Sequence, residues 1–195
     1  MKKSLPVWAV LLALFAGGCA PKSVEVVQVK PYEAKPAAFK KSGKVYFGHI
    51  TDKRKTKDRI GAIVDAKETL TTLRSDVDFA GWFRHAVIDA LKKEGCTILT
   101  KRVYDPQIPR VYLHIDKIDA RYDKSKLTGE NLETQVYVTL LVFHGKDSKI
   151  VKKIGLTERK WIPPVGVTKA IESALQETLQ SVADMVVAHL DDYRF

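Results

Sequence analysis

The chain has 195 residues, 45% of them hydrophobic, and its 33 basic and 23 acidic side chains give a formal net charge of +10 at pH 7. This length and composition fit one domain with a single packed core. The two cysteines, Cys19 and Cys96, allow at most one intrachain disulfide. The positive charge favours acidic partners such as anionic lipid headgroups or acidic polymers.

The first 19 residues predict a lipoprotein signal peptide. Lys2 and Lys3 precede an uncharged apolar run over residues 5–15, which is too short to cross a bilayer core of ~30 Å. The sequence Ala-Gly-Gly-Cys at positions 16–19 resembles the bacterial lipobox. The resemblance implies export, removal of residues 1–18, diacylglycerol on the Cys19 sulfur and an acyl chain such as palmitate on the new amine. A transmembrane anchor or a buried core helix is the alternative interpretation.

Export also bears on location and partners. The signal peptide contains Lys2 and Lys3, so its loss lowers the net charge by two, to +8. An exported lipoprotein meets little nucleic acid, so nucleic-acid binding is not expected despite the basic composition. Ala20 stands where an aspartate would direct retention in the inner membrane of enteric-type bacteria. We therefore expect the protein to be anchored at the periplasmic face of the outer membrane.

Residues 19–42 are expected to form a lipidated flexible tether, because they hold three prolines and few large apolar side chains. Valines between positions 24 and 29 allow a short edge strand there. The remaining residues, 43–195, are expected to form a single α+β periplasmic domain. Within it, Cys96 is expected to be a small buried hydrophobe.

Strands and one helix are predicted in the first half of this domain. β-Rich sequence predicts strands over residues 44–50, 60–64 and 68–73. Apolar residues at helical spacing predict a helix that ends near residue 93, with Gly95 just beyond its C-terminus. Ser75 and Asp78 have the spacing of a capping box at its start.

The second half is predicted to contain strands over residues 97–100, 110–122, 132–143 and 150–161, and then a helix that ends near His189. The apolar positions of residues 110–122 shift phase after Lys117, which predicts a β-bulge near Asp116. Residues 145–148 are predicted to be a hairpin loop. The order of elements predicts an α+β fold, with a single antiparallel meander sheet and two helices packed on one face.

This pattern resembles the YajG family of small bacterial lipoproteins over most of the mature domain. The resemblance rests on Asp52-Lys53-Arg54 after a strand, Leu70-Thr71-Thr72-Leu73, Arg74-Ser75-Asp76 before the first helix, and Ala183-Asp184-Met185 in the last helix. It implies an envelope lipoprotein. Because the family has no established catalytic site, the resemblance assigns no functional residue here.

A run of positive charge between two predicted strands is the first candidate contact site. We call residues 51–59 the basic loop. Its cations are Lys53, Arg54, Lys55, Lys57 and Arg59. Each of them can contribute ~1 kcal/mol near an anionic bilayer. The alternatives are an ordinary solvated loop, or a local role in which Asp52 and Arg54 pair with each other or cap the turn.

The second candidate contact site is an apolar row on the outward side of one strand, at Tyr137, Leu141 and Phe143. A sheet face left to water normally carries polar side chains, so this row predicts a partner surface, a dimer contact or a lipid-binding groove, or else cover by the N-terminal tether. Further aromatic residues are expected to join the row: Trp82, Tyr104, Tyr112, Tyr122 and Trp161.

Catalysis has little support in the sequence. The five histidines are scattered, with no metal-ligand spacing, nucleophile elbow or P-loop. No metal and no cofactor are expected apart from the lipids on Cys19. The sequence thus predicts a non-enzymatic, lipid-anchored envelope protein that binds a protein partner or a second copy of itself. The alternative is a module that binds anionic lipid, lipopolysaccharide or peptidoglycan through the basic loop.

Overall fold

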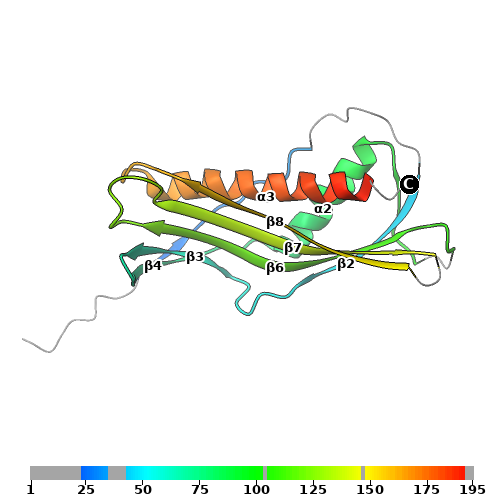
Figure 1. The fold of residues 1–195 in the computed structure, drawn as a ribbon, viewed down its shortest axis with the longest axis horizontal. Helices are drawn as coiled ribbons and strands as arrows, with labels where there is room; N and C mark the ends of the chain where they lie inside the picture. The colour runs from blue at the N-terminus through cyan, green and yellow to red at the C-terminus, as the bar shows by residue number, and fades with distance from the viewer. Residues whose placement is uncertain (1–22, 35–42, 103–104, 146–147, 192–195) are drawn as a thin grey trace, which may run out of the picture.

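The computed structural model describes residues 23–34, 43–102, 105–145 and 148–191. The predicted signal peptide, Cys19 and residues 35–42 lie outside the described residues. Two helices lie over one face of a long, twisted sheet (Figure 1). In chain order the elements are β1 (Ser23–Val26), β2 (Lys44–Asp52), β3 (Arg59–Asp65), β4 (Glu68–Arg74), α2 (Phe79–Lys93), β5 (Thr97–Leu99), β6 (Arg110–Asp123), β7 (Leu132–His144), β8 (Ser148–Lys160) and α3 (Val167–Asp191).

The α+β class is confirmed, but the sheet is mixed, which corrects the antiparallel meander expected from the sequence. β6, β7 and β8 do form an antiparallel meander. β2 and β3, however, both run parallel to β6 along its other edge, with Phe47 beside Val111 and Ala62 beside Arg121. These two strands lie end to end, and the basic loop joins them. Side-chain alternation identifies a strand but not its neighbour or their relative direction, so the sequence pattern did not reveal the parallel pairs.

The remaining strands extend the sheet on both sides of this centre. β5 pairs in parallel with β2, β4 pairs antiparallel with β3, and β1 pairs in parallel with β4. The register shifts between Ile115 and Lys117 of β6, which confirms the bulge predicted near Asp116. His144 pairs with Ser148 across the β7–β8 hairpin, as expected for a turn at residues 145–148.

The core lies between the sheet and the helices. Phe83 of α2 and Val182 of α3 are fully buried, as are the alternate residues of β7 from 132 to 142. Thr134 is the polar member of that row, and its hydroxyl is 2.7 Å from the Thr178 hydroxyl of α3, so neither group is left unsatisfied. In the part of the chain that the structure describes, neither helix combines the length and the apolar character needed to cross a membrane.

Helix α2 is capped by Asp78, which corrects the capping role expected for Ser75. The Asp78 carboxylate accepts a hydrogen bond from the backbone N–H of Ala80 at 3.1 Å. Ser75 is held at the end of β4, where its own N–H donates to the carbonyl of Asp58 at 2.9 Å. At the other end, Gly95 has a φ of 98° just beyond the helix, as its position predicted.

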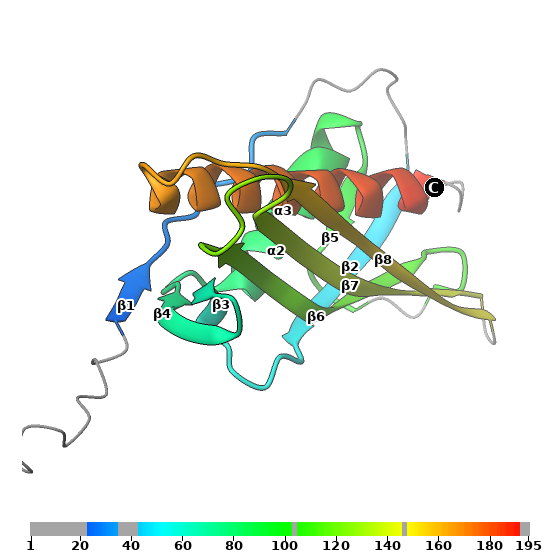
Figure 2. The ribbon, with the colours of Figure 1, turned by 60° about the vertical axis from the view of Figure 1, so that its left-hand side comes forward.

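Residues 23–34 were expected to belong to the tether, and in the structure they pack against the domain. β1 forms the short edge strand that the valines allowed. The segment then crosses the helices on the side away from the sheet (Figure 2). The N–H of Gln28 donates to Glu172 of α3 at 2.9 Å, and the carbonyl of Lys30 accepts from the indole of Trp82 at 2.8 Å. Val27 is buried, so apolar contact and satisfied backbone groups offset the entropy of ordering this segment.

Candidate functional site: the open face of the sheet

The helices cover one face of the sheet and lie away from the other (Figure 1). We call this other face, formed by β2, β6, β7 and β8, the open face. On β7 the structure places Tyr137, Leu141 and Phe143 on this face, while Leu140 and Val142 between them are buried. Residues 23–34 run across the helices instead, so this segment does not cover the predicted apolar row.

Four rings from three strands meet at one end of the open face. We call Tyr46 and His49 of β2, Tyr112 of β6 and Phe143 of β7 the aromatic cluster. The ring centroid of Tyr112 lies 6.2 Å from that of Tyr46, 5.6 Å from that of His49 and 5.6 Å from that of Phe143. All three contacts are edge-to-face, the arrangement that aromatic quadrupoles favour. Rings held by one another lose little further freedom when a partner binds.

Cations and aliphatic side chains surround the aromatic cluster. The Arg110 guanidinium carbon and the Lys149 ammonium nitrogen lie 5.6 Å and 5.8 Å from the Phe143 ring centroid. Leu141 lies beside Val151 of β8, which is 54% exposed. Aromatic and arginine side chains are enriched at the centres of protein–protein interfaces.

Two glycines make room for tyrosine rings on the open face. A Cβ at Gly48 would lie 2.4 Å from the Tyr112 ring, and a Cβ at Gly155 would lie 2.2 Å from the Tyr137 ring. Both rings therefore lie across a glycine of the neighbouring strand, a way of covering the exposed backbone. Tyr137 also shares a hydrogen bond of 2.6 Å with the Thr157 hydroxyl. It lies six residues, or about 20 Å of strand, from Phe143 and so outside the aromatic cluster.

Several aromatic residues that the sequence pattern predicted to lie on this face lie elsewhere in the structure. Tyr122 is buried in the core, Trp82 lies under the N-terminal segment, and Trp161 follows the last residue of β8. Tyr104 lies outside the described residues.

The sequence interpretation did not place two members of the aromatic cluster, Tyr46 and His49, on this face. The signal for Tyr46 was present, because it stands between Val45 and Phe47, which are both buried. Alternation therefore turns Tyr46 outward. His49 carries no such signal, because it lies within the register irregularity of β2, between Phe47 and Ile50.

The basic loop exposes one cation fewer than its sequence indicates. Arg54 turns back on Asp52: its Nη2 and Nε lie 2.7 Å and 3.0 Å from the two carboxylate oxygens, and only 6% of its side chain is exposed. The guanidinium also donates to the carbonyl of Lys57 at 2.7 Å and lies 5.0 Å from the Phe79 ring centroid. Burial would raise the pKa of Asp52, but the hydrogen bonds from Arg54 outweigh it and hold that pKa below its usual value. The Asp52–Arg54 pair is thus the alternative that the structure confirms. The cations left exposed are Lys53, Lys55, Lys57 and Arg59.

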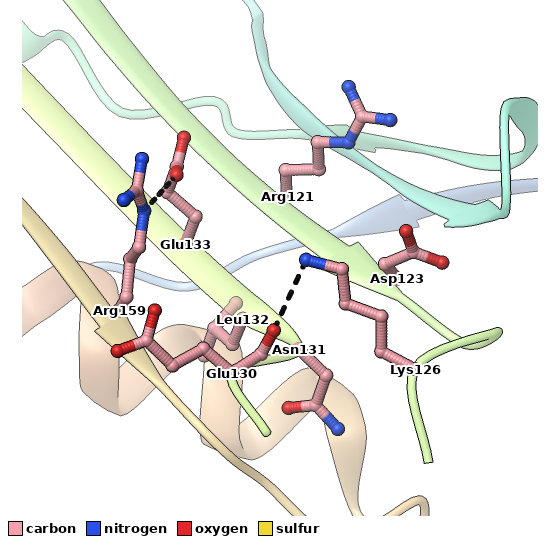
Figure 3. A pocket seen from close by; sticks show the side chains of 8 residues that line it. All are labelled: Arg121, Asp123, Lys126, Glu130, Asn131, Leu132, Glu133 and Arg159. Carbon is pink, nitrogen blue, oxygen red and sulfur yellow. Dashed lines mark hydrogen bonds and ion pairs between the residues drawn. The ribbon is translucent and has the colours of Figure 1, made fainter. Parts of the chain in front are cut away.

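A polar pocket of about 350 Å³ opens at the other end of the open face, where β6 ends and β7 begins (Figure 3). Arg159 forms an ion pair with Glu133, which raises the pKa of Arg159. Lys126 donates to the carbonyl of Glu130 at 3.3 Å. The lining holds as many basic as acidic side chains, so it offers no net charge to attract an ion.

Two titratable groups on β6 are perturbed by their surroundings. Burial, assisted by the charge of Lys53, lowers the pKa of His114. Burial raises the pKa of Asp119. Among the described residues, no three His, Cys, Asp or Glu side chains are grouped so as to hold a metal ion.

Comparison with known proteins places the fold. No sequence family and no curated protein matches the chain. A Xanthomonas campestris protein of the DUF330 family matches in structure with a TM-score of 0.53 and 11% identity, over 89% of this chain and 100% of that one. Rare lipoprotein B from Shewanella oneidensis matches with a TM-score of 0.48 and 14% identity, over 68% of this chain and 94% of that one. A minor lipoprotein from Acinetobacter baumannii matches with a TM-score of 0.42 and 14% identity, over 70% of this chain and 95% of that one. At these identities the likeness concerns the fold alone, and the chain shares the fold of the DUF330 protein.

Proposed function

We propose that this protein is a non-catalytic lipoprotein of the YajG-like type that serves as an accessory component of the cell envelope. Acyl chains on Cys19 hold it at the periplasmic face of the outer membrane, and the open face binds an envelope protein or a second copy of the chain. The lipobox-like residues 16–19 support the anchor. The aromatic cluster carries the binding role.

The physical case for binding is the composition of the open face. The outer side of a solvated sheet normally alternates polar residues with the core residues. Here the aromatic cluster, Leu141 and Val151 place rings and aliphatic side chains there, with Arg110 and Lys149 beside them. Burying such a preorganised surface against a partner gains hydrophobic free energy at a small entropic cost.

Site-specific photocrosslinking in cells tests this function. A photoreactive phenylalanine analogue is placed at Val151 of the full-length chain, beside Leu141 on the open face. The matched control places it at Lys92, an exposed residue of α2. We expect one dominant crosslinked species from position 151 and none from position 92, and its mass distinguishes an envelope protein from a second copy. Leu141→Glu should abolish the species, because the interface would then have to bury a carboxylate. No species above the control would contradict the proposed function.

A second candidate function is binding of an anionic ligand, such as lipid, lipopolysaccharide or peptidoglycan, through the basic loop. It is favoured by the exposure of Lys53, Lys55 and Lys57. Replacing these three by glutamate, with Arg54 kept for the fold, should abolish salt-sensitive binding to anionic vesicles. Unchanged binding would exclude this candidate.

A further inference from the structure

The end of the sheet where the described chain begins also carries the most exposed apolar side chains. Ser23 starts β1 beside Thr71 of β4. The β3–β4 turn, the β6–β7 loop and the β8–α3 connection meet at this same end (Figures 1 and 2). Lys124 donates its N–H to the carbonyl of Val64 at 2.8 Å, which ties the β6–β7 loop to the end of β3. We call residue 23 with residues 65–68, 124–131 and 161–166 the entry end.

Three large apolar side chains project from the entry end. Leu127 is 82% exposed, Val165 is 81% exposed and Trp161 is 51% exposed. The indole N–H of Trp161 donates to the carbonyl of Leu127 at 3.3 Å, so the two loops that carry these side chains are in contact. An indole with a polar edge and an apolar body, next to aliphatic tips, matches the boundary between lipid headgroups and acyl chains.

Hydrogen bonds between Asn131 and the backbone of Ile162 fix the base of this apolar group. Asn131 is buried, and its amide makes two hydrogen bonds to the backbone of Ile162: it accepts from the N–H at 2.7 Å and donates to the carbonyl at 2.9 Å. Ile162 is itself buried. These two hydrogen bonds fix the backbone of Ile162, which directly follows Trp161 and begins the connection that carries Val165. Both side chains therefore project from an ordered backbone.

The charges of the entry end are balanced. Its loops expose three lysines and three carboxylates: Lys67, Lys124 and Lys126, and Asp65, Glu68 and Glu130. Attraction to an anionic surface therefore contributes little here, unlike at the basic loop. Any affinity for a bilayer must come from the apolar side chains.

We propose that the entry end docks on the bilayer that holds the acyl chains of Cys19, with Trp161, Leu127 and Val165 in the headgroup–acyl boundary. This inference rests on the lipid anchor of the proposed function. Cys19 precedes Ser23 by four residues, which span at most about 14 Å even when fully extended. The anchor thus keeps this end of the domain within reach of the lipid, and a weak apolar contact becomes effective at that high local concentration. Docking orients the domain with its β1–β4 end toward the membrane.

Tryptophan quenching by brominated lipid tests the docking. The mature chain holds two tryptophans, and Trp82 is an internal reference because it is 8% exposed and hydrogen-bonded to Lys30. The lipidated protein is reconstituted into phosphatidylcholine vesicles with bromine atoms near the headgroup end of the acyl chains. We expect loss of most of the Trp161 emission, and Trp161→Phe should remove this quenching. Mass spectrometry of the same sample reports whether Cys19 is acylated.

Two variants identify the surface responsible. Combining Leu127→Ser with Val165→Ser should reduce the quenching of Trp161, whereas Met185→Ser, at an exposed apolar position of α3 that belongs to neither the entry end nor the open face, should leave it unchanged. Quenching should be the same in neutral vesicles and in vesicles that contain phosphatidylglycerol. Acylated protein without quenching would overturn the docking and leave the anchor intact, and quenching that needs anionic lipid would also overturn it. An unacylated Cys19 would overturn the anchor, and the docking with it.

Discussion

Replacing Arg54 tests whether this residue stabilises the fold or is available to bind a ligand. Arg54→Ala removes three hydrogen bonds from the guanidinium to the Asp52 carboxylate, one to the Lys57 carbonyl and the contact with the Phe79 ring. Charge-assisted hydrogen bonds contribute about 1.5–3 kcal/mol, and a partly desolvated cation–π contact about 1–2 kcal/mol. Treated as one unit, the loss is about 3 kcal/mol of unfolding free energy. Lys55→Ala, at an exposed position one residue away, should cost about 0.5 kcal/mol or less.

Urea unfolding at pH 7, followed by Trp82 fluorescence, measures this difference. With a urea dependence of about 2 kcal/mol per molar, Arg54→Ala should lower the midpoint by about 1.5 M relative to the wild type, and Lys55→Ala should lower it by about 0.25 M or less. Equal midpoints for the two variants would refute the structural role. The pH dependence gives a second check. The pKa of Asp52 is lowered in the folded chain, so its ionised form adds stability above its unfolded value of 3.8, and this contribution is lost as the pH falls through the folded pKa. The gap between Arg54→Ala and the wild type should therefore narrow below pH 3.8.

Two further predictions concern the open face. Gly48→Ala should destabilise the fold by about 1–3 kcal/mol, because its Cβ would meet the Tyr112 ring, and Tyr112→Ala should relieve most of that cost in a double-mutant cycle followed by urea unfolding. Additive costs in that cycle would show that the ring does not lie over Gly48. Burial raises the pKa of Asp119 in the folded chain. Ionisation of this carboxyl therefore lowers the free energy of unfolding as the pH rises from 3.8 through the folded pKa. Asp119→Asn, which cannot ionise, should be more stable than the wild type at pH 7 and equally stable at pH 3. A variant less stable than the wild type at pH 7 would contradict this sign.

The local features of the fold were predictable because each depends on a short stretch of sequence. The inward row of β7 follows from strict alternation, and the bulge of β6 follows from the change of apolar phase between Ile115 and Ile118. The end of α2 follows from Gly95, whose φ is positive. Its start did not follow as well, since Ser75 and Asp78 are both good capping residues and the pairing of Ser75 with Asp58 decides between them.

The candidate site was predictable only in part. Alternation along β7 placed Leu141 and Phe143 on the outward face. The aromatic cluster was not foreseen as a unit, because Tyr46, Tyr112 and Phe143 are far apart in the chain. They meet only because β2 and β7 flank β6 on its two edges.

The sequence by itself determined which segments are strands and helices, which of their sides are apolar and where an acyl anchor is expected, since these depend on composition and on side-chain periods of 2.0 and 3.6. The tertiary structure alone decided how the strands pair and which charges remain available. Parallel pairing of β2 and β3 with β6 brings the ends of the basic loop together, and Arg54 then finds Asp52 and Phe79 within reach. Packing of residues 23–34 across the helices leaves the open face uncovered by that segment. Such contacts join residues distant in sequence, and their free energy depends on the position of every element between them.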